Sequence, residues 1–99
     1  MNPVIVISAR DNVATALDAL EVGQVIAGPI PFTVREQIPR GHKVSMCAIP
    51  AGGSVIKYGH TIGVATVAIP PGAHVHTHNV ASTRGRGDLA EPPDARRNL

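Results

Sequence analysis

Along most of the chain, short apolar runs alternate with a recurring seven-residue turn motif, which we call a corner. Three copies of the corner read I-P-x-G-x-x-V, at residues 38–44, 49–55 and 69–75, and a weaker copy, L-E-V-G-Q-V-I, lies at residues 20–26. In each copy an apolar residue ends one run, the glycine supplies the positive φ angle that a type II turn requires, and a β-branched residue begins the next run. Because the intervals between the copies are uneven, the chain is not a solenoid of fixed period.

These corners predict an all-β domain of short, strongly bent strands. Proline has no N–H to donate to a ladder, so each corner belongs at the end of a strand. The segment DNVATALDAL, residues 11–20, is the exception, because Asp11 is a potential helix N-cap and the apolar residues 13, 17 and 20 have helical spacing. The same segment also fits a strand over residues 12–17, so the sequence leaves a helix and a strand both open.

Length and composition restrict the class of protein. The 99 residues are enough for one small domain with one core, and Val, Ile and Ala must build most of it because the aromatic residues are only Phe32 and Tyr58. The single cysteine, Cys47, excludes a disulfide framework and a CxxC zinc motif within the chain. We expect the domain to occupy residues 1–80 and the polar residues 81–99 to form a flexible tail.

Charge and hydropathy argue against two kinds of partner. The net charge is only +2, and the basic residues are not interleaved with aromatic residues, so we expect no binding of nucleic acid. No apolar run approaches the roughly 20 residues of a membrane span, and the N-terminus lacks the features of a signal peptide. We therefore expect a cytoplasmic protein without a membrane partner.

The segment VAIPPGAHVHTHNV, residues 67–80, places His74, His76 and His78 at alternate positions. On a continuous strand the three imidazoles would point to one face. Two neighbouring imidazoles could share a metal ion, but the third would lie about 13 Å from the first. The nearest downstream carboxylate is Asp88. The residues alone therefore favour a solvated polar strand face over a complete metal centre.

Four segments, taken in order, resemble one protein family. They are DNVATAL, IPRGHKV, VIKYGHTIGVAT and IPPGAHVHTHN, and together they resemble the N-terminal SAF-type domain of altronate and galactarate dehydratases over about residues 4–80. The resemblance implies a β-clip fold, which is all-β, has short bent strands joined by Pro-x-Gly corners, and contains at most one short helix. A related domain also occurs as a separate small subunit, such as the alpha subunit of sulfolactate sulfo-lyase.

The resemblance implies that the protein is the small subunit of an altronate-type sugar-acid dehydratase, a hydro-lyase, and is inactive alone. In the full-length dehydratases the larger part of the chain holds most of the catalytic machinery. The expected partners are therefore a large catalytic subunit, whose active site this chain completes, and a sugar-acid substrate. Two alternatives stay open, namely the alpha subunit of a sulfolactate sulfo-lyase-like enzyme and a non-enzymatic β-clip binding module. A homo-oligomer also stays open.

The resemblance assigns roles to the alternating histidines. His76 and His78 match the H-x-H motif of the family, which implies that they are catalytic residues or metal ligands facing the large subunit. His74 is the weaker candidate ligand. The dehydratases of this family are associated with Fe²⁺ or Mn²⁺, so we expect such an ion in the assembled enzyme and assign no cofactor to this chain alone.

Cationic and polar residues complete the candidate site. A sugar acid carries a carboxylate and several hydroxyls, which suit cationic partners and hydrogen-bond donors. His42 and Lys43, beside the corner at residues 39–41, are predicted substrate contacts, as are Lys57 and Asn79. Elimination of water beside a carboxylate needs a base, an acid and stabilisation of the developing negative charge. The chain offers imidazole and ammonium groups for this chemistry but few carboxylates, so we expect it to complete a site and not to constitute one.

Overall fold

The computed structural model describes residues 2–28 and 30–82, and these residues form nine β-strands and no helix. The strands are β1 (Val4–Ile5), β2 (Val13–Ala16), β3 (Val25–Ile26), β4 (Phe32–Thr33), β5 (Lys43–Ser45), β6 (Ser54–Lys57), β7 (His60–Ala65), β8 (His74–Val75) and β9 (Val80–Ser82). The all-β prediction is confirmed. The described part contains no helix that could cross a membrane. Most of the predicted tail, residues 83–99, lies outside the described residues.

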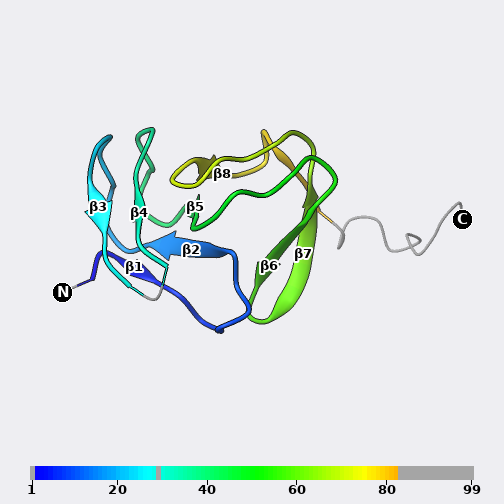
Figure 1. Cartoon of the computed structure of the whole chain (residues 1–99), viewed down its shortest axis with the longest axis horizontal. Helices are drawn as coiled ribbons and strands as arrows, with labels where there is room; N and C mark the ends of the chain where they lie inside the picture. Colours follow the sequence, from blue (N-terminus) through cyan, green and yellow to red (C-terminus); the bar gives the residue numbers. More distant parts are fainter. Residues whose placement is uncertain (1, 29, 83–99) are drawn as a thin grey trace, which may run out of the picture.

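Three antiparallel sheets build the domain (Figure 1). The largest has the strand order β1-β2-β5-β8, the second consists of β3 and β4, and the third has the order β6-β7-β9. In Figure 1 the β3–β4 pair and the β6–β7 hairpin lie at opposite ends of the domain, with β2 between them. The four-stranded sheet therefore connects the two ends.

Residues 13–16 form a strand, and no part of residues 11–20 is helical. Strand β2 pairs on one edge with β1 and on the other with β5, so that Thr15 lies opposite both Ile5 and Lys43. The helix propensity of the alanines in this segment is a weak preference. Hydrogen bonding to neighbouring strands on both edges overrides it.

The four corners adopt the same turn, including the weaker first copy. Each glycine has a φ angle between 83° and 90°, and the N–H of the residue after it donates to the carbonyl of the residue two positions before it. The apolar residues that precede the corners pair across the fold through isolated bridges, Leu20 with Ile38 and Ile49 with Ile69. All four of these side chains are buried. The apolar residue that begins each corner motif is therefore the residue through which two corners pair.

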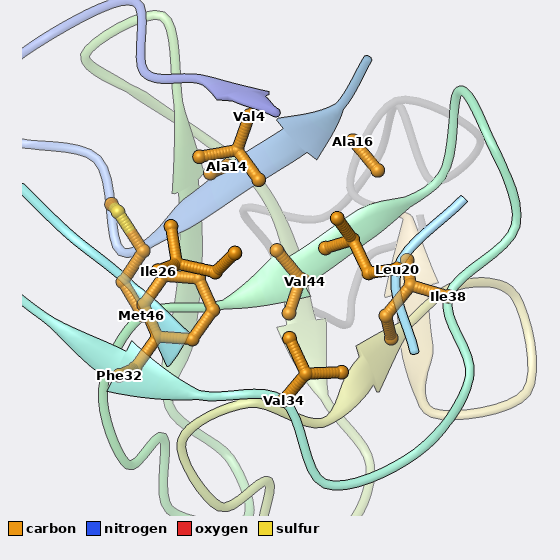
Figure 2. Packing of buried hydrophobic residues seen from close by; sticks show 10 residues of the cluster. All are labelled: Val4, Ala14, Ala16, Leu20, Ile26, Phe32, Val34, Ile38, Val44 and Met46. Carbon is orange, nitrogen blue, oxygen red and sulfur yellow. The ribbon is translucent and has the colours of Figure 1, made fainter. Parts of the chain in front are cut away.

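The buried apolar side chains form two clusters, where length alone predicted a single core. The first cluster, whose side chains converge in Figure 2, contains Val4, Ala14, Ala16, Leu20, Ile26, Phe32, Val34, Ile38, Val44 and Met46. The second contains Val13, Ile49, Val55, Ala65, Ile69, Ala73 and Val75. The division arises because β2 is buried on both faces, with Val13 in one cluster and the alanines in the other.

Asp11 holds the tip of the β6–β7 hairpin. Tyr58 and Gly59 form a two-residue turn with φ angles of 59° and 74°, the signature of a type I′ turn. The Gly59 N–H donates to Asp11 Oδ1 at 2.8 Å, and the Ser8 N–H donates to Asp11 Oδ2 at 3.0 Å. Burial of this carboxyl alone would raise its pKa, but the backbone N–H donors, Gly59 first, outweigh burial and lower the pKa below its usual value.

Asn12 continues the same connection along β6. Its Nδ2 donates to the Ser54 carbonyl at 2.9 Å, and its Oδ1 accepts from the Ile56 N–H at 2.8 Å. The backbone of Asn12 also bonds to both sides, because its N–H donates to the Ile56 carbonyl and its carbonyl accepts from the Met46 N–H. Asp11 and Asn12 therefore fix the β6–β7 hairpin against the four-stranded sheet.

Substitution of Gly72 by alanine should be far more destabilising than the same change at Gly52. Both glycines have a φ angle of 83°, where an alanine costs about 1–2 kcal/mol. A Cβ at Gly72 would lie 1.9 Å from the Thr33 carbonyl oxygen, whereas a Cβ at Gly52 meets nothing within 4 Å. We expect Gly72→Ala to lower the free energy of unfolding by more than about 3 kcal/mol. Urea denaturation measures both losses, and equal losses would contradict this account.

Asp11→Asn should destabilise the protein in a pH-dependent way. The folded-state pKa of Asp11 lies below its usual value of 3.8, so its contribution is fully present above that pH and is lost as the pH falls through the lower, folded-state pKa. Hydrogen bonds to a charged group are worth about 1.5–3 kcal/mol, which sets the expected loss at neutral pH. Denaturation across the acid range measures the difference between the two proteins. The prediction fails if that difference does not narrow in acid.

Candidate functional site

Three of the five histidines meet at the junction of β5 and β8. His42 directly precedes β5, His74 begins β8, and the two strands pair with Val44 opposite His74. One ring nitrogen from each of His42, His74 and His76 lies within 4.8 Å of the other two. His42 Nδ1 and His74 Nε2 are 2.8 Å apart, and the His42 and His76 rings stack with centroids 4.0 Å apart. We call these three side chains the imidazole cluster.

The strand that carries the alternating histidines is shorter than the spacing suggested. Strand β8 ends at Val75, and residues 76–79 form a turn. The geometry of a continuous strand therefore ends at Val75, and His76, which follows the Lys43–Val75 pair, lies in the turn with its ring stacked on that of His42. His78 is exposed, and its ring is tilted against the His74 ring at a centroid distance of 5.1 Å. His78 lies outside the imidazole cluster.

Asn79 fixes the backbone of this turn. Its side chain is buried, with Oδ1 accepting from the His76 N–H at 3.0 Å and Nδ2 donating to the His74 carbonyl at 2.9 Å. Its own N–H donates to the His76 carbonyl. These contacts give Asn79 a positioning role for two members of the imidazole cluster. Its role as a substrate contact stays a prediction.

An open pocket of about 300 Å³ adjoins the imidazole cluster. Its lining consists of Lys43, Lys57, Tyr58, Ile62, His76, Thr77, Val80 and Ser82. The Nζ of Lys57 lies 4.8 Å from the centroid of the Tyr58 ring, in a cation–π contact. We call this hollow the lysine pocket, because two ammonium groups give it positive charge and His76 joins it to the imidazole cluster.

The surroundings of the site lower the pKa of three of its side chains. Burial lowers the pKa of His74, and the neighbouring His42 lowers it further. The pKa of His76 is also lowered, first by burial and then by His42 and Lys43. Burial and the nearby charge of Lys57 lower the pKa of Lys43. Neutral imidazoles can accept a proton or bind a metal ion, so the site can support either kind of chemistry.

The structure groups the predicted residues in a way that the sequence did not indicate. His42 was predicted as a substrate contact, and it lies with the imidazoles. The available signal was its place beside a corner glycine, in a repeat whose other copy carries His74 two residues after the glycine. Tyr58 was not predicted as a site residue, although it lies within the KYG turn of the resemblance. The catalytic and ligand roles of His76 and His78 stay predictions.

The fold and site together define the class of protein. Short antiparallel strands bent at glycine corners, with an imidazole cluster beside a cationic pocket, make this an all-β domain of the SAF-type β-clip kind. Residues 2–83 match the altronate/galactarate dehydratase SAF domain, and the chain belongs to this family. The resemblance drawn from the four sequence segments is confirmed.

Two kinds of relative share the domain. The chain is 46% identical to an altronate dehydratase of Escherichia coli (strain K12) over 74 residues, which are 74% of this chain and 15% of that protein. An altronate dehydratase of Bacillus subtilis (strain 168) is 38% identical over 80 residues, 80% of this chain and 16% of that protein. The (2R)-sulfolactate sulfo-lyase subunit alpha of Chromohalobacter salexigens is 34% identical over 88 residues, 81% of this chain and 94% of that subunit. The chain thus spans 15–16% of the two dehydratases and nearly all of the small subunit.

His74 should titrate below its usual pKa of 6.5 and should respond to its neighbours in order of their influence. We expect His42→Gln to raise the pKa of His74 without restoring the usual value, because burial is the larger cause. The matched change His78→Gln should raise it less, because His78 has a smaller influence. Titration of the imidazole C–H signals by NMR measures each value. A pKa of His74 at or above 6.5 in the unaltered protein would contradict this description of the site.

Proposed function

We propose that this domain completes the active site of a sugar-acid dehydratase of the altronate type, together with a larger catalytic subunit. The observation that carries the proposal is the lysine pocket, which joins the ammonium groups of Lys43 and Lys57 to the imidazole of His76. Its volume of about 300 Å³ lies at the lower end of the range typical of small-molecule sites. Positive charge and hydrogen-bond donors suit a polyhydroxylated carboxylate.

The reaction assigns a task to each group in the pocket. A base removes the proton from the carbon beside the carboxylate, the carbon–oxygen bond to the neighbouring hydroxyl breaks, a double bond forms, and the hydroxyl leaves as water after it gains a proton. His76 lines the pocket, and its imidazole is the proposed base. Lys43 and Lys57 neutralise the carboxylate and the charge that develops on it. His78, exposed on the same turn, faces the partner and serves as the second catalytic group.

A divalent ion, Fe²⁺ or Mn²⁺, belongs to the proposed assembled enzyme. When bound, it supplies Lewis-acid stabilisation of the negative charge on the substrate carboxylate. The imidazole cluster is what this chain offers to such an ion, because its three ring nitrogens approach within 4.8 Å of one another. Because this chain offers few carboxylates, the carboxylate groups of the active site come from the larger subunit.

A second candidate function is that of a sulfolactate sulfo-lyase alpha subunit. The observation that favours it is the match to the (2R)-sulfolactate sulfo-lyase subunit alpha of Chromohalobacter salexigens, which is 34% identical over 81% of this chain. The two functions share a base and a bound carboxylate and differ in the group that leaves, which is water in one and sulfite in the other. The lysine pocket suits both substrates, so the leaving group has to be measured.

Reconstitution tests both functions. The chain is co-expressed with the large lyase subunit of its native host, the complex is purified by size exclusion, and it is assayed with altronate, galactarate and sulfolactate in the presence of Fe²⁺ or Mn²⁺. We expect dehydration of a sugar acid by the complex and by neither chain alone. Sulfite release from sulfolactate would replace the first function with the second. A chain that joins no lyase subunit would overturn both and leave a binding module.

Two substitutions separate binding from chemistry in the reconstituted enzyme. We expect His76→Ala to lower kcat by about a hundredfold or more, the contribution of a positioned general base. Lys43→Met should mainly raise KM, because it removes a charge that holds the carboxylate and keeps the length of the side chain. His60→Ala is the matched control, since His60 is exposed and does not line the lysine pocket. Full activity in both variants would refute the assigned roles.

A further inference from the structure

The imidazole cluster is assembled by parts of the chain that the fold holds rigidly. The carbonyl of His42 accepts from the Ala16 N–H at 2.9 Å, which ties it to β2. His74 lies in the ladder between β5 and β8, and Asn79 hydrogen-bonds the backbone of both His74 and His76. The three imidazoles therefore meet without any contribution from a second chain.

The spacing within the cluster is close to that of ligands on a shared ion. Two imidazole nitrogens on one tetrahedral ion lie about 3.3–3.4 Å apart, given metal–nitrogen bonds of about 2.0–2.1 Å. His42 Nδ1 and His74 Nε2 are 2.8 Å apart and share a hydrogen bond. An ion in place of the shared proton would require these nitrogens to separate by about 0.5 Å and both rings to turn toward it. Both rings can stay neutral, because the donating ring moves that proton to its other nitrogen.

His76 supplies the third nitrogen by a rotation. Its ring stacks on His42 with an angle of 17° between the planes, whereas a metal ion lies in the plane of each ring that binds it. The His76 side chain is half-buried and borders the lysine pocket, which leaves room for the ring to turn. Ion binding would thus replace a stacking contact with a bond.

The donor set selects a class of ion. Three imidazoles without a thiolate or carboxylate suit divalent transition metals that prefer nitrogen, and they do not suit Mg²⁺ or Ca²⁺, which prefer oxygen. The nearest carboxylate in contact with the cluster is that of Glu36, whose Oε2 accepts from the His74 backbone N–H at 3.1 Å. That contact is made to the His74 backbone and not to its imidazole.

We propose that His42, His74 and His76 form a three-histidine site that binds one divalent transition-metal ion within this chain alone. His76 also lines the lysine pocket, so the three-histidine site borders that pocket. A coordinated His76 cannot also accept a proton, so in the proposed reaction it would leave the ion before it acts as the base, and this last step rests on the proposed function. The metal site itself does not, since all three of its ligands are on this chain.

Titration of the metal-free 99-residue chain tests the site in the absence of a partner or substrate. Co²⁺ is the probe, because its visible absorption reports the number and geometry of its ligands, and calorimetry with Zn²⁺ gives the stoichiometry. We expect one ion per chain, a nitrogen-ligand spectrum and no competition from Mg²⁺. The absence of stoichiometric binding by the unaltered chain would overturn the proposal, and this result depends on no variant.

Single substitutions identify the ligands. His42→Ala, His74→Ala and His76→Ala should each weaken Co²⁺ binding by more than about a hundredfold, beyond the effect typical of residues outside the ligand set. His60→Ala is the control for adventitious surface binding, and His78→Ala separates the cluster from a ligand pair on the turn. Loss of binding with His78→Ala but not with His42→Ala would overturn the assignment. Metal binding by a chain without lyase activity in the reconstituted complex would refute the proposed function and leave this site intact.

Discussion

The close approach of the Gly72 backbone to the neighbouring strands determines where His74 lies. Its N–H donates to the Ser45 carbonyl at 2.7 Å, and its carbonyl accepts from the Arg35 N–H at 3.0 Å. The left-handed conformation and the absence of a Cβ make both contacts compatible with the nearby Thr33 carbonyl. His74 follows two residues later, already in register with β5. A backbone constraint in a corner thus places a side chain of the candidate site.

The corners were predictable because their cause is local. A glycine that needs a positive φ angle and an apolar residue before the turn are visible in seven residues, even in the weak copy at residues 20–26, which lacks the proline. The state of residues 11–20 was not predictable, because it depends on which strands flank β2. The single expected core failed for the same reason, since only the folded chain shows that Val13 and Ala14 pack in opposite directions.

The candidate site was predictable in composition and only partly in arrangement. Spacing identified the histidines of residues 74–78, but the end of β8 depends on Asn79 turning back to bond two backbone groups. His42 joins the imidazole cluster because β5 pairs with β8, and these two strands lie far apart in sequence. Lys57 and Tyr58 come to the pocket through a hairpin that Asp11 holds in place. The Asn79 contacts are local, but the β5–β8 pairing and the contact of Asp11 with the hairpin are long-range, and local spacing does not encode them.

The burial of β2 on both faces bears on how the domain unfolds. Strand β2 places Val13 in one apolar cluster and Ala14 and Ala16 in the other, and it pairs with strands on both edges. Melting either cluster would release β2 and expose apolar surface of the other. The two halves are therefore coupled into one cooperative unit, despite their separate interiors. Since the imidazole cluster lies beside β5, the strand that pairs with β2, its geometry persists or is lost together with the whole domain.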